Sequence, residues 1–462
     1  MAKLRIADLK KTYYYLRRNG IVNTAAAAME RLEQKRQDAY VWIPPTEEAL
    51  RSQREWYARL SEEQAGVSEA EQTADSLPLF SIVVPTFRTP EAYLRRMIDS
   101  VLGQTYPKLE LVLADATDSD AVKLVTDTYN DSRIRYVKLA ENAGIAENTN
   151  RGIEAADGDY IGLLDHDDVL TEDALYEMAN RILTARKQGI TLEMLYSDED
   201  KCDGEEKLYF DPHYKEDFNF DLLLSNNYIC HFLVMKSTLM KKLGFRQDFD
   251  GAQDFDLALR AAVELKDRTE TIAHIDKVLY HWRCHVASTA DNPRSKAYAY
   301  EAGLRAVQAA ADCLQIQAVA CESKHLGFYR LQYNGSLLQT RKDLAAVGGP
   351  IIRKGKIAGG RMDAAGKIYY EGLPKAYSGY LHRAVLMQDA QALDIRNITV
   401  APDLRPLFET CVGVPYKCEE GSERFDCRTL PADADCKELS LRLSKALLET
   451  GRKLLYLPEN VG

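Results

Sequence analysis

Hydrophobic and polar positions follow two alternating periods in the middle of the chain, from about Phe80 onward. FSIVVPTF is a short apolar run typical of a strand, and the next segment, EAYLRRMIDSVLGQT, has the period of a helix. Its apolar face consists of Leu94, Met97, Ile98, Val101 and Leu102. Further strands are predicted at LELVLADA, IRYVKL and DYIGLLDHDD, with a helix around IAENTNRGIEAA. This alternation predicts an α/β fold with a mainly parallel sheet and a nucleotide-binding half.

The first 38 residues favour a helix in which cationic and apolar side chains are mixed. The cations are Lys3, Arg5, Lys10, Lys11, Arg17 and Arg18, set among Leu4, Ile6, Leu9, Tyr13, Tyr14 and Leu16. Such a helix can lie on an anionic membrane surface. It can equally pack on its own catalytic domain. Residues 40–78, with Pro44 and Pro45, are expected to form a linker with a short helix.

Beyond about Gln315 the strand and helix pattern weakens into a glycine-rich stretch and a tyrosine-bearing segment, YYEGLPKAYSGYLHRAVL. A final helix is predicted at CKELSLRLSKALLETG, where Gly451 suits the end of a helix. We therefore expect three parts: a helical region and linker over 1–79, a domain over 80–314, and a C-terminal α/β domain over 315–462.

The composition narrows the class of protein. A formal net charge of -10 argues against a nucleic-acid binder. No run of 18 apolar residues occurs, and the first segment lacks a signal-peptide pattern, so a cytoplasmic location is expected. The chain has 9 cysteines without a CxxC pair, which indicates reduced thiols. The last four are spaced too widely for a zinc knuckle.

Three carboxylates follow the predicted strand DYIGLL, at Asp165, Asp167 and Asp168, with His166 between them. The carboxyl edge of an open α/β sheet is where such folds bind ligands. A divalent cation would relieve the repulsion among these carboxylates, and Mg²⁺ or Mn²⁺ combines a few carboxylates with phosphate oxygens. The arrangement suggests a nucleotide diphosphate held through a metal ion.

These motifs occur in the order and spacing of one fold. From Phe80 to about Ala290 the chain resembles family 2 glycosyltransferases, through LLDHDDVL, YSDEDK, NYICHF, GAQDFDLALR and KVLYHWR. The likeness is greatest to bacterial enzymes of O-antigen, rhamnan or capsular polysaccharide assembly. The resemblance implies a GT-A fold, a Rossmann-like domain that binds nucleotide-diphosphate sugars with Mn²⁺ or Mg²⁺.

The resemblance also implies a nucleotide-sugar site. Asp115 would bind the uracil or thymine edge or the ribose, Asp165 would meet the ribose beside His166, and Asp167 would ligate the metal. The base would lie against Pro85, Thr86 and Phe87, and the diphosphate side would be lined by Asn142, Gly144, Asn148 and Arg151. A turn before a helix is the other interpretation of Asn142 and Gly144.

Within GAQDFDLALR, the resemblance implies that Asp254 is the general base, although many relatives have glutamate where this chain has Gln253. Asp256 is the alternative base, and its position two residues on would point it elsewhere in a helix. Both aspartates could instead simply pair with the helix dipole.

Two further groups are candidates for the same site. By resemblance His281 completes the metal shell, with His285 as a weaker candidate, while a packed structural histidine is the other interpretation. Trp282 either stacks on acceptor sugar or fills the core. In the cluster of Asp198, Glu199, Asp200 and Lys201, the family places acceptor-side or donor-sugar contacts, although charges of this kind also suit a solvated turn.

The expected reaction is attack of an acceptor hydroxyl on the anomeric carbon with inversion, from a UDP- or dTDP-sugar to a glycan or polyprenyl-linked acceptor. The chain lacks the QxxRW motif of processive synthases. Two alternatives remain. The first is a glycosyltransferase-like subunit that binds a nucleotide sugar or glycan without turnover. The second is a metal-dependent nucleotidyltransferase, but such an enzyme usually has a glycine-rich basic loop near its first strand, and VVPTFRTP does not resemble that loop. The C-terminal part resembles a reduced glycosyltransferase-like unit without the acidic motif.

Overall fold

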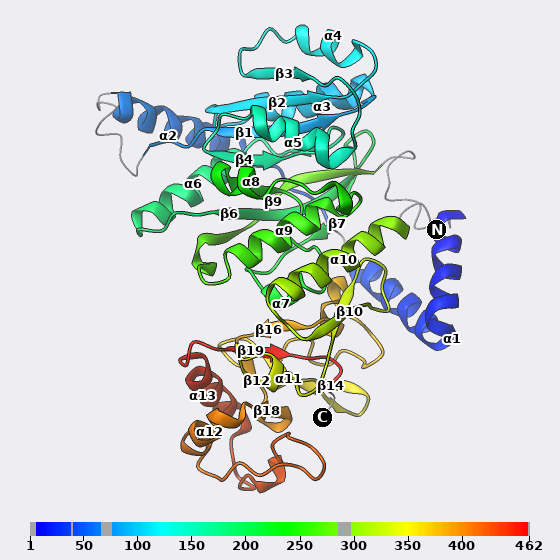
Figure 1. Ribbon diagram of the computed structural model, residues 1–462, viewed down its shortest axis with the longest axis vertical. Coiled ribbons are helices and arrows are strands. Elements are labelled where there is room, and N and C mark those ends of the chain that lie inside the picture. The colour runs from blue at the N-terminus through cyan, green and yellow to red at the C-terminus, as the bar shows by residue number, and fades with distance from the viewer. Residues whose placement is uncertain (1–5, 38–39, 66–75, 285–296, 461–462) are drawn as a thin grey trace. The chain divides into compact units, whose positions relative to one another are not determined.

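The computed structural model describes residues 6–37, 40–65, 76–284 and 297–460, and the chain forms two compact units (Figure 1). The central unit comprises Tyr40–Phe218 and Asn227–Ala306. The terminal unit comprises Met1–Ala39, Asn219–Asn226 and Val307–Gly462. The helix α10 (Ala297–Cys313) contains the last boundary between them.

The central unit is built on a nine-stranded sheet in the order β3-β2-β1-β4-β8-β6-β9-β5, with β7 paired to β6. Strands β1 to β4 pair in parallel, β6 also pairs in parallel with β9, and the other pairs are antiparallel. The strands are β1 (Phe80–Thr86), β2 (Leu109–Asp115), β3 (Ile134–Lys138), β4 (Tyr160–Leu163), β5 (Val169–Leu170), β6 (Met194–Asp203), β7 (Tyr209–His213), β8 (Leu233–Lys236) and β9 (Ile272–Cys284). The expected α/β fold is confirmed.

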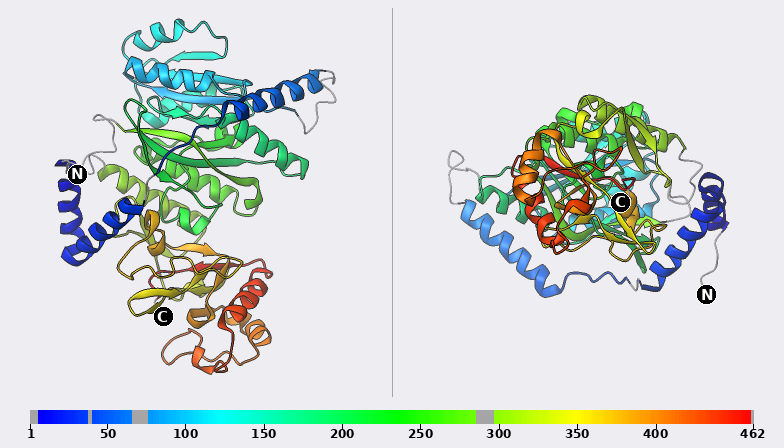
Figure 2. Two further views of the ribbon diagram at one scale, coloured as in Figure 1. Left: turned by 180° about the vertical axis from the view of Figure 1, so that it is seen from behind. Right: turned by 90° about the horizontal axis from the view of Figure 1, so that it is seen from below.

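Alternate residues of β1 face different helices, which explains its nearly continuous apolar sequence. Ile82 and Val84 pack in a core with Leu94 of α3 (Glu91–Leu102) and Met178 of α6 (Ala174–Lys187). On the opposite face, Val83 meets α5 (Ile145–Ala155) at Gly152, where a Cβ atom would lie 2.6 Å from the valine. Helices therefore cover both faces of the sheet, as the front and back views show (Figures 1 and 2).

The remaining helices of the central unit are α2 (Glu47–Ala65), α4 (Ala121–Asp127), α8 (Ser237–Leu243) and α9 (Gln253–Glu264). The expected linker helix is α2, and it packs on the sheet unit rather than standing free. Trp56, Tyr57 and Leu60 contact the main core, and Thr105 donates a 2.8 Å hydrogen bond to Gln53.

The terminal unit contains a four-stranded sheet in the order β16-β19-β12-β18, with β16 (Gln388–Ala390), β19 (Lys453–Tyr456), β12 (Leu344–Gly348) and β18 (Ile398–Val400). Its core packs the helices α12 (Arg405–Val412) and α13 (Cys436–Leu448) through Phe408, Leu443 and Leu447. Short paired strands complete it: β10 (Ala318–Glu322) with β11 (Tyr329–Tyr333), β13 (Ile351–Arg353) with β14 (Lys356–Gly359), and β15 (Arg361–Met362) with β17 (Ala392–Leu393). The predicted final helix is α13.

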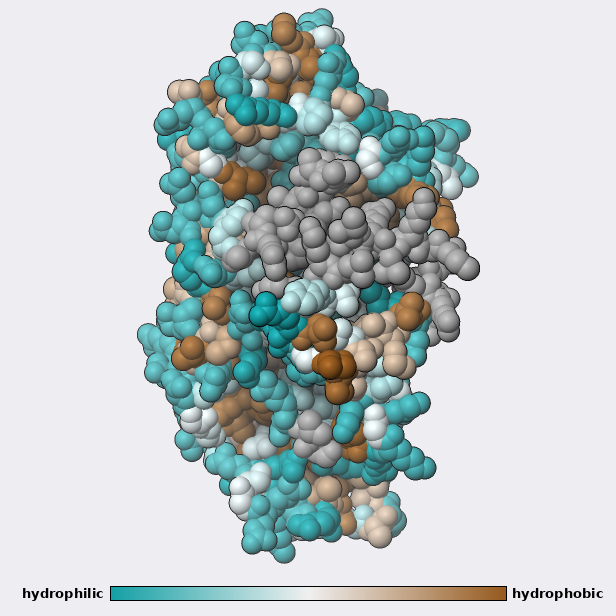
Figure 3. Space-filling model, turned by 90° about the vertical axis from the view of Figure 1, so that its right-hand side faces the viewer, coloured by the Kyte–Doolittle hydropathy of each residue, from teal (hydrophilic) through white to brown (hydrophobic). Residues whose placement is uncertain are grey.

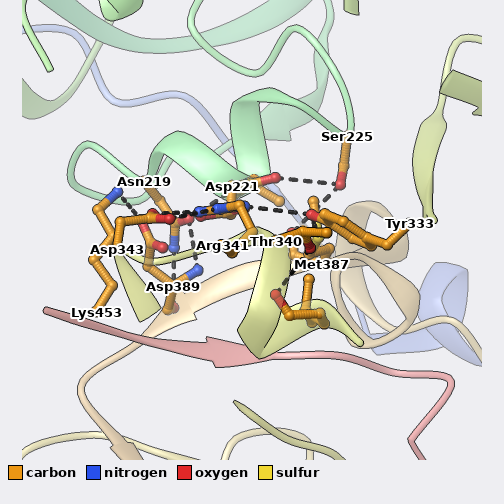
Figure 4. A network of polar contacts seen from close by, with 12 residues as sticks. Asn219, Asp221, Ser225, Tyr333, Thr340, Arg341, Asp343, Met387, Asp389 and Lys453 are labelled. Carbon is orange, nitrogen blue, oxygen red and sulfur yellow. Dashed lines mark hydrogen bonds and ion pairs between the residues drawn. The ribbon is translucent and has the colours of Figure 1, made fainter. Parts of the chain in front are cut away.

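A buried ion-pair network joins the short helix α7 (Phe220–Leu223) to this sheet (Figure 4). Arg341 forms a two-pronged pair with Asp221 at 2.8 and 2.9 Å, and both side chains are at most 3% exposed. Lys453 lies 3.3 Å from Asp389. Asn219 accepts a hydrogen bond from the backbone of Asp389 at 2.9 Å. These contacts hold the segment 219–226 within the terminal unit.

The long helix α1 (Ile6–Gln37) also belongs to the terminal unit, with non-helical geometry at Gly20, where φ is 77°. Its buried Glu30 accepts hydrogen bonds from the backbone of Ser378 and Gly379. The compact units thus differ from the expected division at 79 and 314, because α1 packs on C-terminal residues and α2 packs on the sheet.

Part of α1 exposes apolar side chains. Ile21 is 77% and Val22 80% exposed, and Figure 3 shows hydrophobic residues gathered among hydrophilic ones on the face it displays. Lys3, Leu4 and Arg5 lie outside the described residues. Among the described residues, no helix is long and apolar enough to cross a membrane. All nine cysteines are free thiols.

Candidate active site

A hollow of about 100 Å³ lies at the carboxyl ends of β1 and β4. We call it the Asp254 hollow. Its wall consists of Val83, Pro85, Ile145, Thr149, Leu163, Leu164, Asp165, Cys230, His231, Leu233, Phe245, Gln253 and Asp254. Three predicted site residues, Pro85, Asp165 and Asp254, are therefore brought together from segments up to 169 positions apart in the sequence. The strand pattern predicted the carboxyl edge of the sheet for Asp165, and the family resemblance implied the site roles of Pro85 and Asp254.

Asp254 and Asp256 lie in the first turn of α9 but have different surroundings. Asp256 is 1% exposed and pairs with Arg246 and Arg260, so its charge is already matched. Asp254 faces the hollow and accepts a 2.9 Å hydrogen bond from Asn227 Nδ2. Burial raises the pKa of Asp254 above its usual value, and the positive charge of His231 opposes this rise. A carboxylate poised in this way suits a general base.

His231, which sequence reasoning missed, lies with Glu199 at the centre of a polar cluster. Glu199 accepts from the backbone N–H of His231 at 2.8 Å, and its carboxylate lies 3.1 Å from Nδ1 of His231 and 3.0 Å from Nδ1 of His213. Burial alone would lower the pKa of His231, but Glu199, with Asp165 and Asp168, raises it to about 9. His231 is thus a cation beside Asp254 at neutral pH. The motif NYICHF contains it, yet nothing local distinguishes this histidine from a packed one.

The loop after β4 carries the predicted metal-binding carboxylates. The Asp165 side chain is 47% exposed, with one oxygen 4.0 Å from His231 Nε2. Burial, followed by the charges of Asp165 and Asp167, raises the pKa of Asp168 well above its usual value. Asp168 receives a hydrogen bond from the Tyr280 hydroxyl and one from the backbone of Arg283. The carboxylates of this loop are hard oxygen donors of the kind that a divalent cation prefers, and metal ligation by Asp167 stays a prediction.

His281 lies in the interior, 2% exposed, with Nδ1 hydrogen-bonded to Asp200. Its ring packs against Trp42 at 4.5 Å and Tyr209 at 4.6 Å, and Nε2 has no hydrogen-bond partner among the residues that the structure describes. Within 6–37, 40–65, 76–284 and 297–460, no group of three or more His, Cys, Asp or Glu side chains forms a metal cage. His285 lies outside these residues. Metal ligation by His281 stays a prediction, and its contacts match the packed histidine.

The acidic cluster on β6 points inward. Asp198 is 1% exposed. Its carboxylate accepts a hydrogen bond from the backbone N–H of Lys215 and lies 2.8 Å from Nε2 of His274. Asp200 accepts a 2.7 Å hydrogen bond from the Tyr40 hydroxyl. Trp282 is half-buried, with the Lys201 ammonium 5.6 Å from its ring centre. Both aspartates have protein partners, and sugar contacts by any of the three stay predictions.

The predicted base-binding residues divide by exposure. Asp115 is fully buried and accepts from Thr86, Thr117, Tyr136 and Lys138. Burial favours the neutral acid, but these hydrogen bonds hold the pKa of Asp115 below its usual value. Phe87 is 38% exposed, with the Arg88 guanidinium 5.1 Å from its ring centre. Asp115 therefore orders the loop after β2, and its contact with a nucleotide stays a prediction.

The predicted diphosphate side lies at the amino end of α5. Asn142 Oδ1 accepts from the backbone of Gly144 at 3.2 Å and from Asn148 Nδ2 at 2.8 Å, and Gly144 has φ of 98°. These contacts match the turn interpretation. Asp250 accepts a 3.3 Å hydrogen bond from the backbone of Ala146, which places a carboxylate at this helix end. Arg151 is half exposed and pairs with glutamates of its own helix. A diphosphate contact here stays a prediction.

His166 has a buried Nδ1 without a hydrogen-bond partner in the described part of the chain. A polar atom left unsatisfied in this position is costly unless a ligand or water completes it. This observation is consistent with the predicted role of His166 at the nucleotide-sugar site.

Comparison with known proteins agrees with this geometry. Residues 81–244 match the family described as Glycosyl transferase family 2. An uncharacterized protein of Sinorhizobium fredii is 40% identical over 52% of this chain and 26% of its own length. The O-antigen biosynthesis protein RfbC of Myxococcus xanthus is 35% identical over 57% of this chain and 20% of its own length. The chain therefore matches about a quarter or less of these two relatives.

A shorter relative is covered more fully. The Escherichia coli protein named "Putative colanic acid biosynthesis glycosyl transferase WcaA" is 30% identical over 40% of this chain and 67% of its own length. Among solved structures, S. aureus TarS in complex with UDP has 17% identity and a TM-score of 0.39, over 50% of this chain and 65% of that chain, too distant a likeness to carry an argument. Family match, relatives and the parallel-rich sheet together show that this chain belongs to the family 2 glycosyltransferases of the GT-A type.

Proposed function

We propose that the central unit transfers a sugar from a UDP- or dTDP-sugar, with inversion, to a glycan or polyprenyl-linked glycan in bacterial cell-surface polysaccharide synthesis. The observation that carries the proposal is that Asp254 and Asp165 line one hollow at the carboxyl edge of the sheet. Two further points support the proposal: open α/β folds bind ligands at this edge of the sheet, and two relatives are named for O-antigen and colanic acid biosynthesis.

In the proposed reaction Asp254 accepts the proton of the attacking hydroxyl as that oxygen bonds to the anomeric carbon. Asn227 donates a hydrogen bond to Oδ2 of Asp254, which fixes the direction of this carboxylate in the hollow. His231 lowers the cost of keeping Asp254 ionised. A divalent cation, when bound at Asp167, would neutralise the departing diphosphate.

We further propose that the chain acts in the cytoplasm, at the inner membrane face. The exposed Ile21 and Val22 on α1, together with the cations between positions 3 and 18 of the sequence, support peripheral contact with anionic lipid.

The test is nucleotide-diphosphate release from a panel of UDP-, dTDP- and GDP-sugars with Mn²⁺ or Mg²⁺, for wild type, Asp254→Asn and Asp167→Ala. Turnover by wild type alone is the expected result and identifies the donor. Asp120→Asn, on the outer surface before α4, is a control that should keep wild-type turnover. Metal-dependent donor binding without turnover, with glycan acceptors present, would instead favour a non-catalytic assembly subunit.

A further inference from the structure

The terminal unit holds a cavity that is larger than the Asp254 hollow, and the two share no lining residue. Its volume is about 750 Å³. Small-ligand sites have volumes of about 300–1,000 Å³. All of its lining residues belong to the terminal unit, and they come from α1, from β10, β11 and their connection, from the segment 375–387 and from the residues after β19.

Helix α1 is fixed on both sides of this cavity. On one side, Arg18 pairs with Glu322 at 2.6 Å, and Asn19 Nδ2 donates to the Lys324 carbonyl at 3.1 Å. On the other side, the carboxylate of Glu30, 6% exposed, accepts from Ser378 N at 3.0 Å and Gly379 N at 2.6 Å. The cavity therefore lies between two specific polar attachments of one helix, and α1 forms its wall rather than a loose cover.

The wall next to α1 combines aromatic rings with neutral polar groups. Tyr15 and His325 line the cavity with ring centres 5.8 Å apart, and His325 stacks at 3.5 Å on His382, which does not itself line the cavity. Burial lowers the pKa of His325 to about 4 and that of His382 to about 3, so both rings are uncharged at neutral pH. Asn23 Nδ2 donates to the Asn19 carbonyl at 2.8 Å, which fixes the direction of that amide.

Both arginines that line the cavity form ion pairs. Arg18 is paired with Glu322, and Arg330 lies 3.1 Å from Glu459. A phosphate-binding site would instead present unmatched arginines or a helix amino end. The amide and charged side chains of the wall also argue against an acyl chain, because an apolar ligand would bury these groups without hydrogen-bond partners, which is costly.

We propose that this cavity binds a saccharide. Aromatic rings offer an apolar face with a polar edge, and amide and paired charged side chains offer hydrogen-bond partners in several directions, which is the chemistry that a hydroxyl-bearing ring requires. That the saccharide is a segment of the glycan acceptor rests on the proposed function. The terminal unit would then hold the growing chain while the central unit binds the donor.

A filling variant tests the site with little change to its polar contacts. Ala27 lines the cavity on α1, whereas its neighbour Ala28 is exposed and does not line it. Binding of purified full-length protein would be measured on an array of bacterial surface oligosaccharides, and the strongest hit titrated by calorimetry. Ala27→Trp is expected to weaken that binding at least 10-fold, Asn23→Ala severalfold, and Ala28→Trp not at all.

Two outcomes would overturn the inference: no binding of wild type to any saccharide on the array, or equal binding by wild type and Ala27→Trp. Circular dichroism and UDP titration of each variant verify folding, since UDP binding is expected to stay unchanged. Asp254→Asn is expected to retain saccharide binding. If no donor is turned over but Ala27→Trp still abolishes saccharide binding, the proposed function fails while this site stands.

Discussion

The two units bury carboxylates in opposite ways. In the terminal unit, Asp221 is matched by Arg341 through two hydrogen bonds (Figure 4). In the central unit, Asp254 faces a hollow, accepts a hydrogen bond from Asn227, and has the cation His231 and the carboxylate Asp165 nearby. A matched pair serves attachment, whereas a carboxylate left facing a hollow with a raised pKa is available for proton transfer.

The largest expected effect separates activity from stability within one helix. Asp254→Asn is expected to lower kcat by about 10²–10⁴-fold, the usual contribution of a general base, with little loss in Tm. Its matched control is Asp256→Asn, which leaves Arg246 and Arg260 without their carboxylate and should lower Tm. Donor turnover and thermal melting are measured on both. If the Asp254→Asn protein is fully active, Asp254 is not the general base.

In the terminal unit the same substitution should act on stability. Asp221→Asn leaves the buried Arg341 without its two-pronged partner, at a cost of about 3–5 kcal/mol in the free energy of unfolding. Arg341 holds the pKa of Asp221 far below its usual value, so this stability is present at neutral pH and lost as pH falls through the acid range. Urea unfolding at pH 7 measures it. The control Asp403→Asn, in an exposed pair with Arg452, should cost less than about 1 kcal/mol.

A smaller effect is expected when the single cation beside Asp254 is removed. Without His231, the pKa of Asp254 rises, and because the base must be ionised, the acid limb of kcat/KM moves to higher pH in His231→Gln. Turnover near pH 6 should fall about 10-fold, with partial recovery at higher pH. His213→Gln, which also loses a Glu199 contact, serves as the control. Equal pH profiles for wild type and His231→Gln would show that His231 does not control the pKa of Asp254.

The smallest effect concerns Asp389, whose pKa is raised to about 7 by burial and by the charge of Asp221. Between the ordinary carboxyl pKa of about 4 and that value, the folded state binds more protons than the unfolded state, so stability falls as pH rises. Asp389→Asn should flatten this slope between pH 5 and 7, by on the order of 1 kcal/mol. Urea unfolding at both pH values is the measurement, and an unchanged slope would contradict the raised pKa.

Much of the central sheet could be predicted because β1 to β4 are local patterns. Strands β1, β2 and β4 are short apolar runs, and α3 after β1 and α5 after β3 each have one apolar face. Periodic segments of this kind fold the same way in many contexts. The acidic loop after β4 followed directly from the strand that precedes it. His231 could not be predicted as a cation, because its pKa depends on Glu199, a residue 32 positions away.

The helices α1 and α2 show where local pattern was insufficient. Both were predicted as helices within one N-terminal part, yet α2 packs on the central core through Trp56 and α1 attaches to C-terminal residues through Glu30. The apolar periodicity of a helix depends on its own residues, but the surface on which it packs depends on residues that are distant in the sequence.

The sequence alone determined the fold class, the first four strands of the sheet and the family, because apolar periodicity and contiguous motifs are local properties. Only the tertiary structure decided which of two neighbouring aspartates is matched by arginines and which faces a hollow. It also decided that Asp198 and Asp200 turn inward, and that α1 walls a cavity in the terminal unit. Charge, burial and hydrogen bonding depend on groups brought together by folding, and no spacing along the chain records them.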